Sequence, residues 1–148
     1  AARIEEGGRL AALIGTQVDD IDRLRGAAAA TAAAQPAALK ARLKTQVDAL
    51  LGATANFSEE RLAQEVALLV TKVDVREELD RLAAHIAGAR KLIGEGGAIG
   101  RRFDFLCQEF NREANTLCSK SADVELTGIG LEMKAVIDQL REQVQNIE

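Results

Sequence analysis

The chain has 148 residues, of which 47% are hydrophobic and 28% are charged. This length and composition suit one folded domain with a sizeable core, and they exclude disorder of the whole chain. The net charge of -4 argues against a uniformly basic nucleic-acid-binding protein but is compatible with a local basic patch. No run of about 18 apolar residues is present, so we expect no membrane span.

Apolar residues recur at helical spacing along most of the chain, and no alternating strand pattern of useful length occurs. An all-α fold is therefore predicted. We expect the alanine-rich residues 27–35 to form a loop, Pro36 to open a helix, and Asp74 with Glu77 to form a capping box. Four glycines between residues 94 and 100 are expected to break the chain again. The expected helices cover about residues 5–25, 36–51, 58–73, 74–93, 101–118 and 124–147.

The predicted helices are long, and their apolar stripes are narrow with heptad-like spacing. Antiparallel hairpins or a bundle bury such stripes, and we expect oligomerisation to complete the core. The two cysteines, Cys107 and Cys118, are 11 positions apart, about 16 Å along one helix, which is too far for a disulfide. We interpret them as small apolar residues and expect a reduced, cytoplasmic setting.

The helix expected at residues 101–118 carries two separate groups of polar residues. Glu109 and Glu113 lie one turn apart, where two carboxylates can share a divalent cation or divide acid and base roles. They can equally be solvated charges that pair with Arg102 and Arg112. The opposite flank carries a polar strip formed by Asp104, Gln108, Asn111 and Asn115.

Four other side chains have both a functional and a structural interpretation. Asparagine is unfavourable in mid-helix, so Asn111 and Asn115 indicate contacts with backbone, RNA or another subunit. Phe105 is predicted to face away from the core, as an oligomer contact or, alternatively, as a platform for base stacking. His85 is the only histidine, and it is interpreted as a boundary residue or as a metal ligand or general base.

Three cations are candidates for phosphate contacts. Arg101 and Arg102 follow the glycine-rich break at the start of a predicted helix, where a phosphate would meet free amides and two cations. Lys120 lies between two serines at the far end of that helix and would provide a second phosphate contact. The alternatives are a flexible connector with solvated arginines and an ordinary cation at a helix C-terminus.

Short motifs are spread over nearly the whole chain, at residues 3–7, 60–69, 74–79, 100–106, 108–109, 111–117, 119–121 and 141–148. In these motifs the chain resembles the C-terminal half of the bacterial YicC/YloC family. The resemblance implies a cytoplasmic endoribonuclease that depends on a divalent metal, manganese or magnesium, assembles as a homohexamer and acts on single-stranded or structured RNA rather than DNA. It also implies that residues 1–148 are a single helical C-terminal domain of a larger protein.

We therefore expect metal-assisted hydrolysis of RNA phosphodiester bonds, with Glu109, Glu113 and Arg112 as the catalytic residues. Glu109 and Glu113, together with His85, are predicted to hold a cation that activates water and neutralises the transferring phosphate. The alternative function is a non-catalytic helical module for oligomerisation and RNA binding within a larger protein. The predicted RNA-binding residues are Arg101, Arg102, Lys120, Asn111 and Asn115.

Overall fold

The structure is a computed structural model, and it describes residues 2–31, 34, 36–53, 58–96, 99–121 and 123–146. This part of the chain forms α-helices and contains no strand, which confirms the predicted all-α class. None of its helices is both long enough and apolar enough to cross a membrane. The helices are α1 (Ala2–Ala30), α2 (Pro36–Ala53), α3 (Glu59–Val73), α4 (Arg76–Glu95), α5 (Gly100–Lys120) and α6 (Val124–Gln145).

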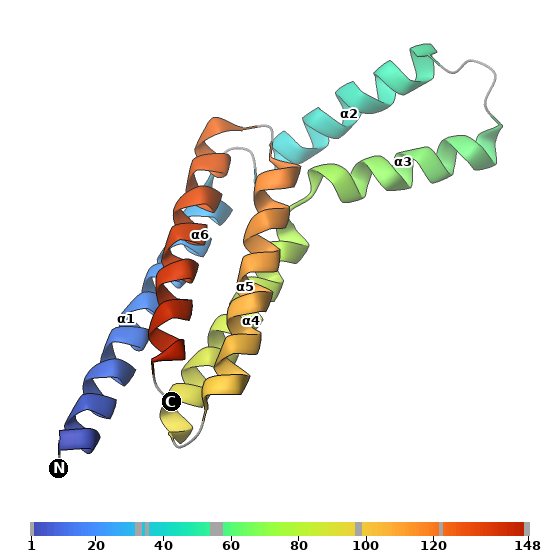
Figure 1. Cartoon of the computed structure of the whole chain (residues 1–148). Coiled ribbons are helices and arrows are strands. Elements are labelled where there is room, and N and C mark those ends of the chain that lie inside the picture. Colours follow the sequence, from blue (N-terminus) through green and yellow to red (C-terminus); the bar gives the residue numbers. More distant parts are fainter. Residues whose placement is uncertain are drawn as a thin grey trace.

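Helices α1, α4, α5 and α6 lie side by side, and we call this group the bundle (Figure 1). Helix α1 packs against α4 and α6, and α5 packs against the same two helices, so the four enclose one core. Helices α2 and α3 pack against each other and project from one end of the bundle as an arm. Consecutive helices α4 and α5 are joined by a short connection and run antiparallel along one seam.

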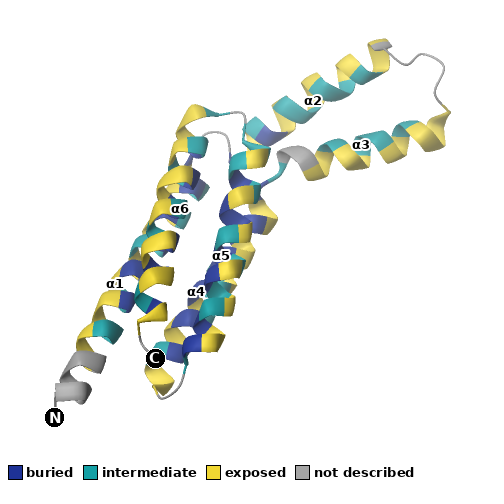
Figure 2. Ribbon diagram, viewed as in Figure 1, coloured by how far each residue is buried: buried dark blue, intermediate teal, exposed yellow. Residues whose placement is uncertain are grey.

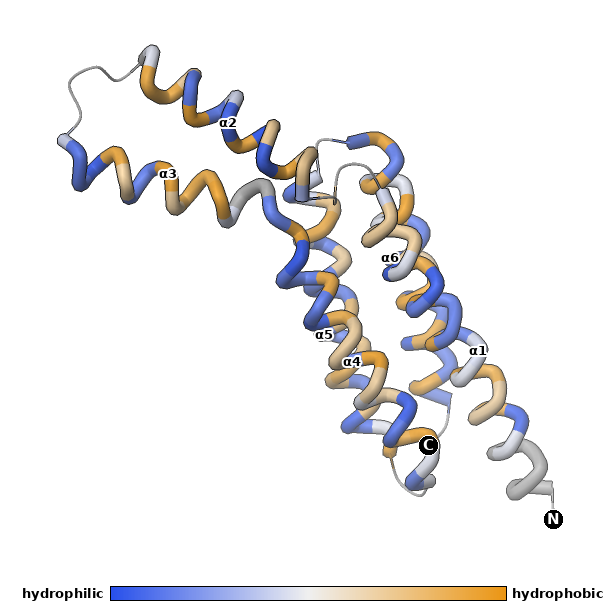
Figure 3. Tube along the Cα trace, turned by 180° about the vertical axis from the view of Figure 1, so that it is seen from behind, coloured by the Kyte–Doolittle hydropathy of each residue, from blue (hydrophilic) through white to orange (hydrophobic). Residues whose placement is uncertain are grey.

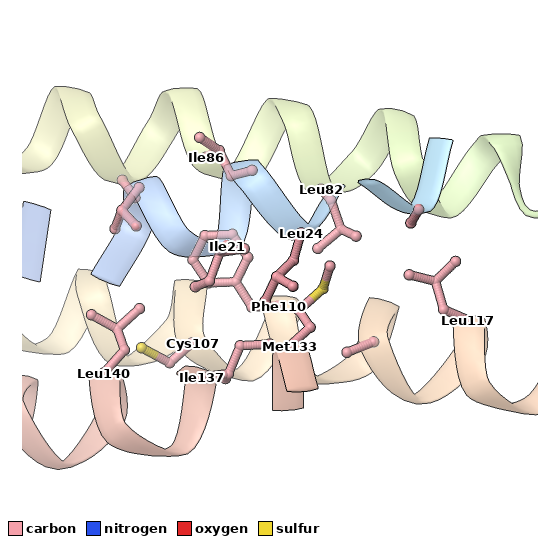
Figure 4. Packing of buried hydrophobic residues seen from close by; sticks show 14 of the residues in the cluster. Ile21, Leu24, Leu82, Ile86, Cys107, Phe110, Leu117, Met133, Ile137 and Leu140 are labelled. Atoms are coloured by element: carbon pink, nitrogen blue, oxygen red, sulfur yellow. The ribbon is translucent and has the colours of Figure 1, made fainter. Parts of the chain in front are cut away.

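The bundle core is built from the apolar stripes that the sequence predicts. Side chains from all four helices interdigitate in it, as Figure 4 shows for Ile21, Leu82, Phe110 and Met133. Burial of each large apolar side chain contributes roughly 1.5–3 kcal/mol relative to exposure. The bundle residues that are at most 1% exposed include Ile14, Val18, Ile21, Leu24, Leu82, Phe103, Cys107, Phe110, Leu117, Met133, Ile137 and Leu140.

The arm buries much less of its surface than the bundle. Apolar residues recur along α2 and α3 as they do along the other helices (Figure 3), yet most of the arm is half-buried or exposed (Figure 2). Leu39 is buried, whereas Leu51, Leu68 and Val70 are exposed large hydrophobic residues. The arm meets the bundle where Arg42 Nη1 donates a hydrogen bond of 3.3 Å to the Lys120 carbonyl oxygen.

The expected loop at residues 27–35 is wrong over its first four residues, because α1 continues to Ala30. Alanine has the highest helix propensity, and Ala28 is 0% exposed within the core, so the helix gains packing by continuing. Residues 32, 33 and 35 of that stretch lie outside the described residues. Helix α2 begins at Pro36, as predicted.

The expected capping box at Asp74 is also wrong. Helix α4 begins at Arg76, with Val75 as N-cap and no side-chain cap. The Asp74 carboxylate instead accepts a hydrogen bond from the Arg76 backbone N–H at 2.9 Å and pairs with the Arg76 guanidinium. This local pair competes with the cap for the same oxygen, and Glu77 pairs with Arg81 rather than with the backbone.

One of the two helix ends that flank the α5–α6 connection differs from expectation. Helix α5 runs on to Lys120, two residues past the expected end. Helix α6 begins at Val124, as predicted, with the Asp123 side chain accepting a hydrogen bond from the Leu126 N–H. Residue 147, the expected end of this helix, lies outside the described residues.

Candidate metal centre

Three of the predicted site residues converge on the seam between α4 and α5. His85 comes from α4, and Glu109 and Glu113 come from successive turns of α5. Each offers one ligand atom, and these atoms all lie within 4.8 Å of one another. The antiparallel pairing of α4 with α5 is what brings a histidine to residues 24 and 28 positions further along the chain.

The His85 ring packs against Phe110 and leaves its Nε2 atom without a hydrogen-bond partner in the described part of the chain. The ring lies edge-on to Phe110, with centroids 6.2 Å apart and planes at 88°, a favourable aromatic geometry. Its Nε2 atom is buried and has no hydrogen-bond partner among the described residues. The nearest Glu109 oxygen is 3.9 Å away, too far for a hydrogen bond. A buried ring nitrogen beside two carboxylates is therefore available as a ligand.

Glu113 is the most deeply buried ligand of this cluster. Its side chain is 4% exposed, and its nearest cation is Arg81, with 3.7 Å between Nη1 and Oε2. Burial raises the pKa of the Glu113 carboxyl above its ordinary value, and the neighbouring charge of Glu78 adds to this, while Arg81, His85 and Arg112 oppose it. A buried carboxylate costs free energy unless it is paired or bound to a cation.

The donor set fits a divalent cation. Two carboxylates and one imidazole suit a transition ion such as manganese better than magnesium, because magnesium strongly prefers oxygen ligands. A cation here would use the free His85 nitrogen and would compensate the buried charge of Glu113. The predicted metal ligands His85, Glu109 and Glu113 are thus close enough together to serve as one site.

A second buried carboxylate, which is not among the predicted site residues, lies next to this centre. Glu78 is 2% exposed, its Oε1 atom lies 2.6 Å from Lys120 Nζ, and its Oε2 atom is buried without a partner among the described residues. The available signal was its position three residues after Val75, on the predicted apolar stripe of that helix. Its place there indicates burial, which for a glutamate requires a partner.

Lys120 therefore has an internal role in addition to its predicted phosphate contact. Its ammonium donates to Glu78 and, at 3.1 Å, to the Asp74 carbonyl oxygen. A lysine has three donors, so these two contacts leave one N–H for another acceptor. The Lys120 side chain is 17% exposed, and its role in RNA binding stays a prediction.

The predicted cationic residues lie at different heights along α5. Arg112 is exposed and adjoins Glu113 in the sequence. Arg102 pairs with Glu95 at 3.2 Å and precedes Glu109 by seven residues, about 10 Å along the helix axis. Arg101 and Arg102 thus lie two turns from the cluster, towards the connection between α4 and α5.

The structure does not bring Asn111 and Asn115 to the metal cluster. Each is two residues from Glu113, a rotation of about 200° around the helix, which places both on another flank. On this flank Asp104 accepts a hydrogen bond from Gln108 at 3.2 Å and lies 3.4 Å from Arg141 of α6. The predicted polar strip therefore includes a contact between helices, and the roles of the two asparagines stay predictions.

The fold and the cluster together define an all-α protein with a candidate divalent-cation site between two antiparallel helices. Comparison with protein families gives a match over residues 28–148 to the family described as "Endoribonuclease YicC-like, C-terminal". The chain belongs to this family, which confirms the resemblance seen in its motifs.

Two curated relatives are named "Probable endoribonuclease YicC". The protein of Haemophilus influenzae (strain ATCC 51907 / DSM 11121 / KW20 / Rd) is 38% identical over 152 residues, which cover 100% of this chain and 50% of the relative. That of Clostridioides difficile (strain 630) is 42% identical over 107 residues, which cover 72% of this chain and 36% of the relative. The chain thus spans half or less of the length of these relatives.

Proposed function

We propose that this chain is the helical domain of a metal-dependent endoribonuclease that hydrolyses phosphodiester bonds in RNA. The observation that supports the proposal is the convergence of His85, Glu109 and Glu113 within 4.8 Å, with a buried imidazole nitrogen that has no hydrogen-bond partner among the described residues. The names of the relatives, probable endoribonucleases, support RNA as the substrate.

His85, Glu109 and Glu113 would hold the divalent cation, manganese or magnesium. When bound, such an ion supplies Lewis-acid stabilisation of phosphate charge and a water of lowered pKa. The protein contributes a fixed donor set, since Phe110 fixes the His85 ring and Glu109 and Glu113 are held one turn apart on α5.

The exposed cations of α5 would bind and orient the RNA backbone. Arg112 adjoins the cluster and would contact the reacting phosphate, because a guanidinium can form two parallel hydrogen bonds to phosphate oxygens. Arg101 and Arg102 would bind phosphates two turns away. Lys120 has one donor left for a further phosphate, and Asn111 and Asn115 would orient RNA that continues over the other flank of α5.

The assembly and setting of the protein are also part of this proposal. We infer a cytoplasmic homo-oligomer, a hexamer by resemblance, whose ligand is RNA and not DNA. The exposed Leu51, Leu68 and Val70 of the arm support oligomerisation, because the apolar stripes of the arm are incompletely buried within one chain.

The test of catalysis replaces both acidic ligands. Glu109→Gln/Glu113→Gln should abolish cleavage of labelled RNA in manganese or magnesium while the helical circular dichroism is unchanged, because the amide removes both negative ligands at nearly constant shape. The matched control is Glu132→Gln/Glu142→Gln, which changes two exposed glutamates of α6. Undiminished turnover by the first variant would remove both residues from the mechanism.

Metal binding is tested separately from cleavage. Titration of manganese should raise the Tm of the wild-type chain, since a ligand that binds only the folded state stabilises it. In His85→Gln, the same rise in Tm should require at least about tenfold more manganese. An equal rise in the control Glu132→Gln/Glu142→Gln is expected, and an equal rise in His85→Gln would exclude His85 as a ligand.

The second candidate function is a non-catalytic module for oligomerisation and RNA binding. It is favoured by the exposed apolar residues of the arm and by the chain's span of half its relatives' length. A band shift of labelled RNA without fragments, seen also with the protein expressed from its complete gene, would favour the module. Fragments that disappear in EDTA would favour the enzyme.

A further inference from the structure

We propose that a groove beside the metal centre holds one unpaired base of single-stranded RNA, with Phe105 as its stacking platform. The inference rests on the proposed function, because it specifies which form of RNA the centre would receive. Phe105, Gly88 and the cations of the groove rim supply the argument, and none of them belongs to the metal cluster itself.

The groove lies between α4 and α5 and has a volume of about 470 Å³. Its lining is mostly apolar, and ligand pockets of small molecules have volumes of this order. Gly88 lines the groove without a side chain; an added Cβ would lie 3.8 Å from Leu106 Cδ2, and we expect a leucine at this position to extend into the groove. The lining residues are Gly88, Lys91, Leu92, Arg101, Arg102, Phe105 and Leu106.

Phe105 has the exposure of a binding residue rather than of a core residue. It is 60% exposed, while Phe103 and Phe110 of the same helix are 0% exposed. An exposed aromatic ring on a rigid helix offers a flat face on which any base can stack, and such stacking is largely independent of sequence.

The cationic lining residues, which we call the rim of the groove, favour a polyanion as the ligand. Lys91, Arg101 and Arg102 are among the lining residues, and within the described part only Arg102 of these three has an ion-pair partner. A second copy of the chain fits less well, because a two-fold contact of this face with itself would oppose like charges. RNA supplies both an apolar base for the floor and phosphates for the rim.

The groove and the candidate metal centre are neighbours along the seam between α4 and α5. Gly88 follows His85 by three residues on α4, and Phe105 precedes Glu109 by four residues on α5, one helical turn in each case. A base in the groove would therefore place a neighbouring phosphate near the cluster. A base inside a duplex is stacked and paired, so this arrangement selects unpaired nucleotides.

The experiment measures base-dependent binding in EDTA, where no cleavage is needed. The 148-residue chain is titrated into a fluorescent 12-nucleotide oligouridine and into an abasic strand of the same length. We expect about tenfold tighter binding of oligouridine. Phe105→Ala and Gly88→Leu should remove this preference, Phe105→Trp should keep it, and Leu131→Ala, a change at another exposed apolar residue, should leave it intact.

The rim is tested with the same two strands. Arg101→Gln should weaken binding of both strands equally and lower the slope of log Kd against log salt concentration by about one, because it removes a phosphate contact. A change in the base preference alone would contradict the assignment of Arg101 to phosphate.

Two results would overturn the base site. One is an unchanged preference in both Phe105→Ala and Gly88→Leu. The other is loss of self-association in Phe105→Ala, measured by sedimentation, with RNA preference unchanged, which would assign the groove to subunit contacts. Absence of cleavage together with the expected preference would leave the groove in place and remove the nuclease proposal. Metal-dependent cleavage by the wild-type chain, together with an unchanged base preference in Phe105→Ala and Gly88→Leu, would support the nuclease proposal and remove the base site.

Discussion

Glu113 shows how one side chain can be unfavourable for stability and useful for function. Its carboxyl is nearly fully buried, and its closest cation is 3.7 Å away, so the fold only partly compensates the negative charge. The buried charge costs free energy without a counterion, and a bound cation would lower this cost. This is the electrostatic condition that favours cation binding.

This environment predicts a pH dependence of stability. Because the pKa of Glu113 is raised above its ordinary value of 4.5 in the folded protein, the folded state binds the proton more tightly than the unfolded state. The contribution of Glu113 to the free energy of unfolding therefore falls as pH rises from about 4.5 through the folded pKa. Glu113→Gln should remove this decline, as measured by urea unfolding between about pH 4 and pH 8 in EDTA.

The matched control for this prediction is Glu132→Gln, an exposed glutamate on α6, which should keep the wild-type dependence. If Glu113→Gln declines in parallel with the wild-type protein, the buried carboxyl is not the source of the effect. The difference between the two variants is informative because the substitution is the same and only burial differs.

At the residue level the sequence predicts the three candidate ligands His85, Glu109 and Glu113, but not the geometry that brings them together. The spacing of Glu109 and Glu113 already places both carboxylates on one side of a helix. His85 joins them only through the register of α4 against α5, and a single sequence contains no direct measure of that register. Glu78 was missed for a related reason, because its partner Lys120 lies 42 positions away.

At the level of the helices, the contact of α5 with α6 depends on Gly130. A Cβ at this position would lie 2.6 Å from Cys118 Sγ, so the absence of a side chain allows the two helices to approach. Cys118 thus acts as a small apolar residue, as the sequence predicts, and it packs against Gly130 of the neighbouring helix.

Gly130→Ala is expected to destabilise the protein by about 1 kcal/mol. Overpacking costs roughly 1–3 kcal/mol, and the higher helix propensity of alanine offsets about 1 kcal/mol of this. Gly128→Ala is the matched control, since nothing lies within 4 Å of its added Cβ, and it should stabilise the protein. Urea unfolding measures both changes. A loss in Gly130→Ala that persists when Cys118→Ala is added would contradict the assigned clash.

The helix boundaries show where local rules succeed and where packing overrides them. Pro36 opens its helix as predicted because its fixed φ and missing N–H suit that position. The sequence predicts a loop at residues 27–30 because a run of alanines has no distinct apolar face. Packing of Ala28 in the core favours a helix at these residues instead. A single sequence does not show this, because the burial depends on neighbours that lie on other helices.

For the whole molecule, the division into bundle and arm predicts a difference in local stability. Regions with little buried apolar surface open more readily, and α2 and α3 are mostly half-buried or exposed. Amides of the arm should therefore exchange with solvent deuterium on the order of 100-fold faster than amides of α6, as measured by mass spectrometry. Equal protection would show that another surface, such as a second copy, covers the arm.

The pairing of α4 with α5 has a further consequence for any multimer. The imidazole and both acidic groups of the proposed centre come from one helical hairpin within residues 76–120. Each protomer would consequently carry a complete set of ligands, and none would need to be borrowed across a boundary between protomers. Evolution could then remodel the projecting arm, and with it the number and arrangement of copies, without separating the groups that perform the chemistry.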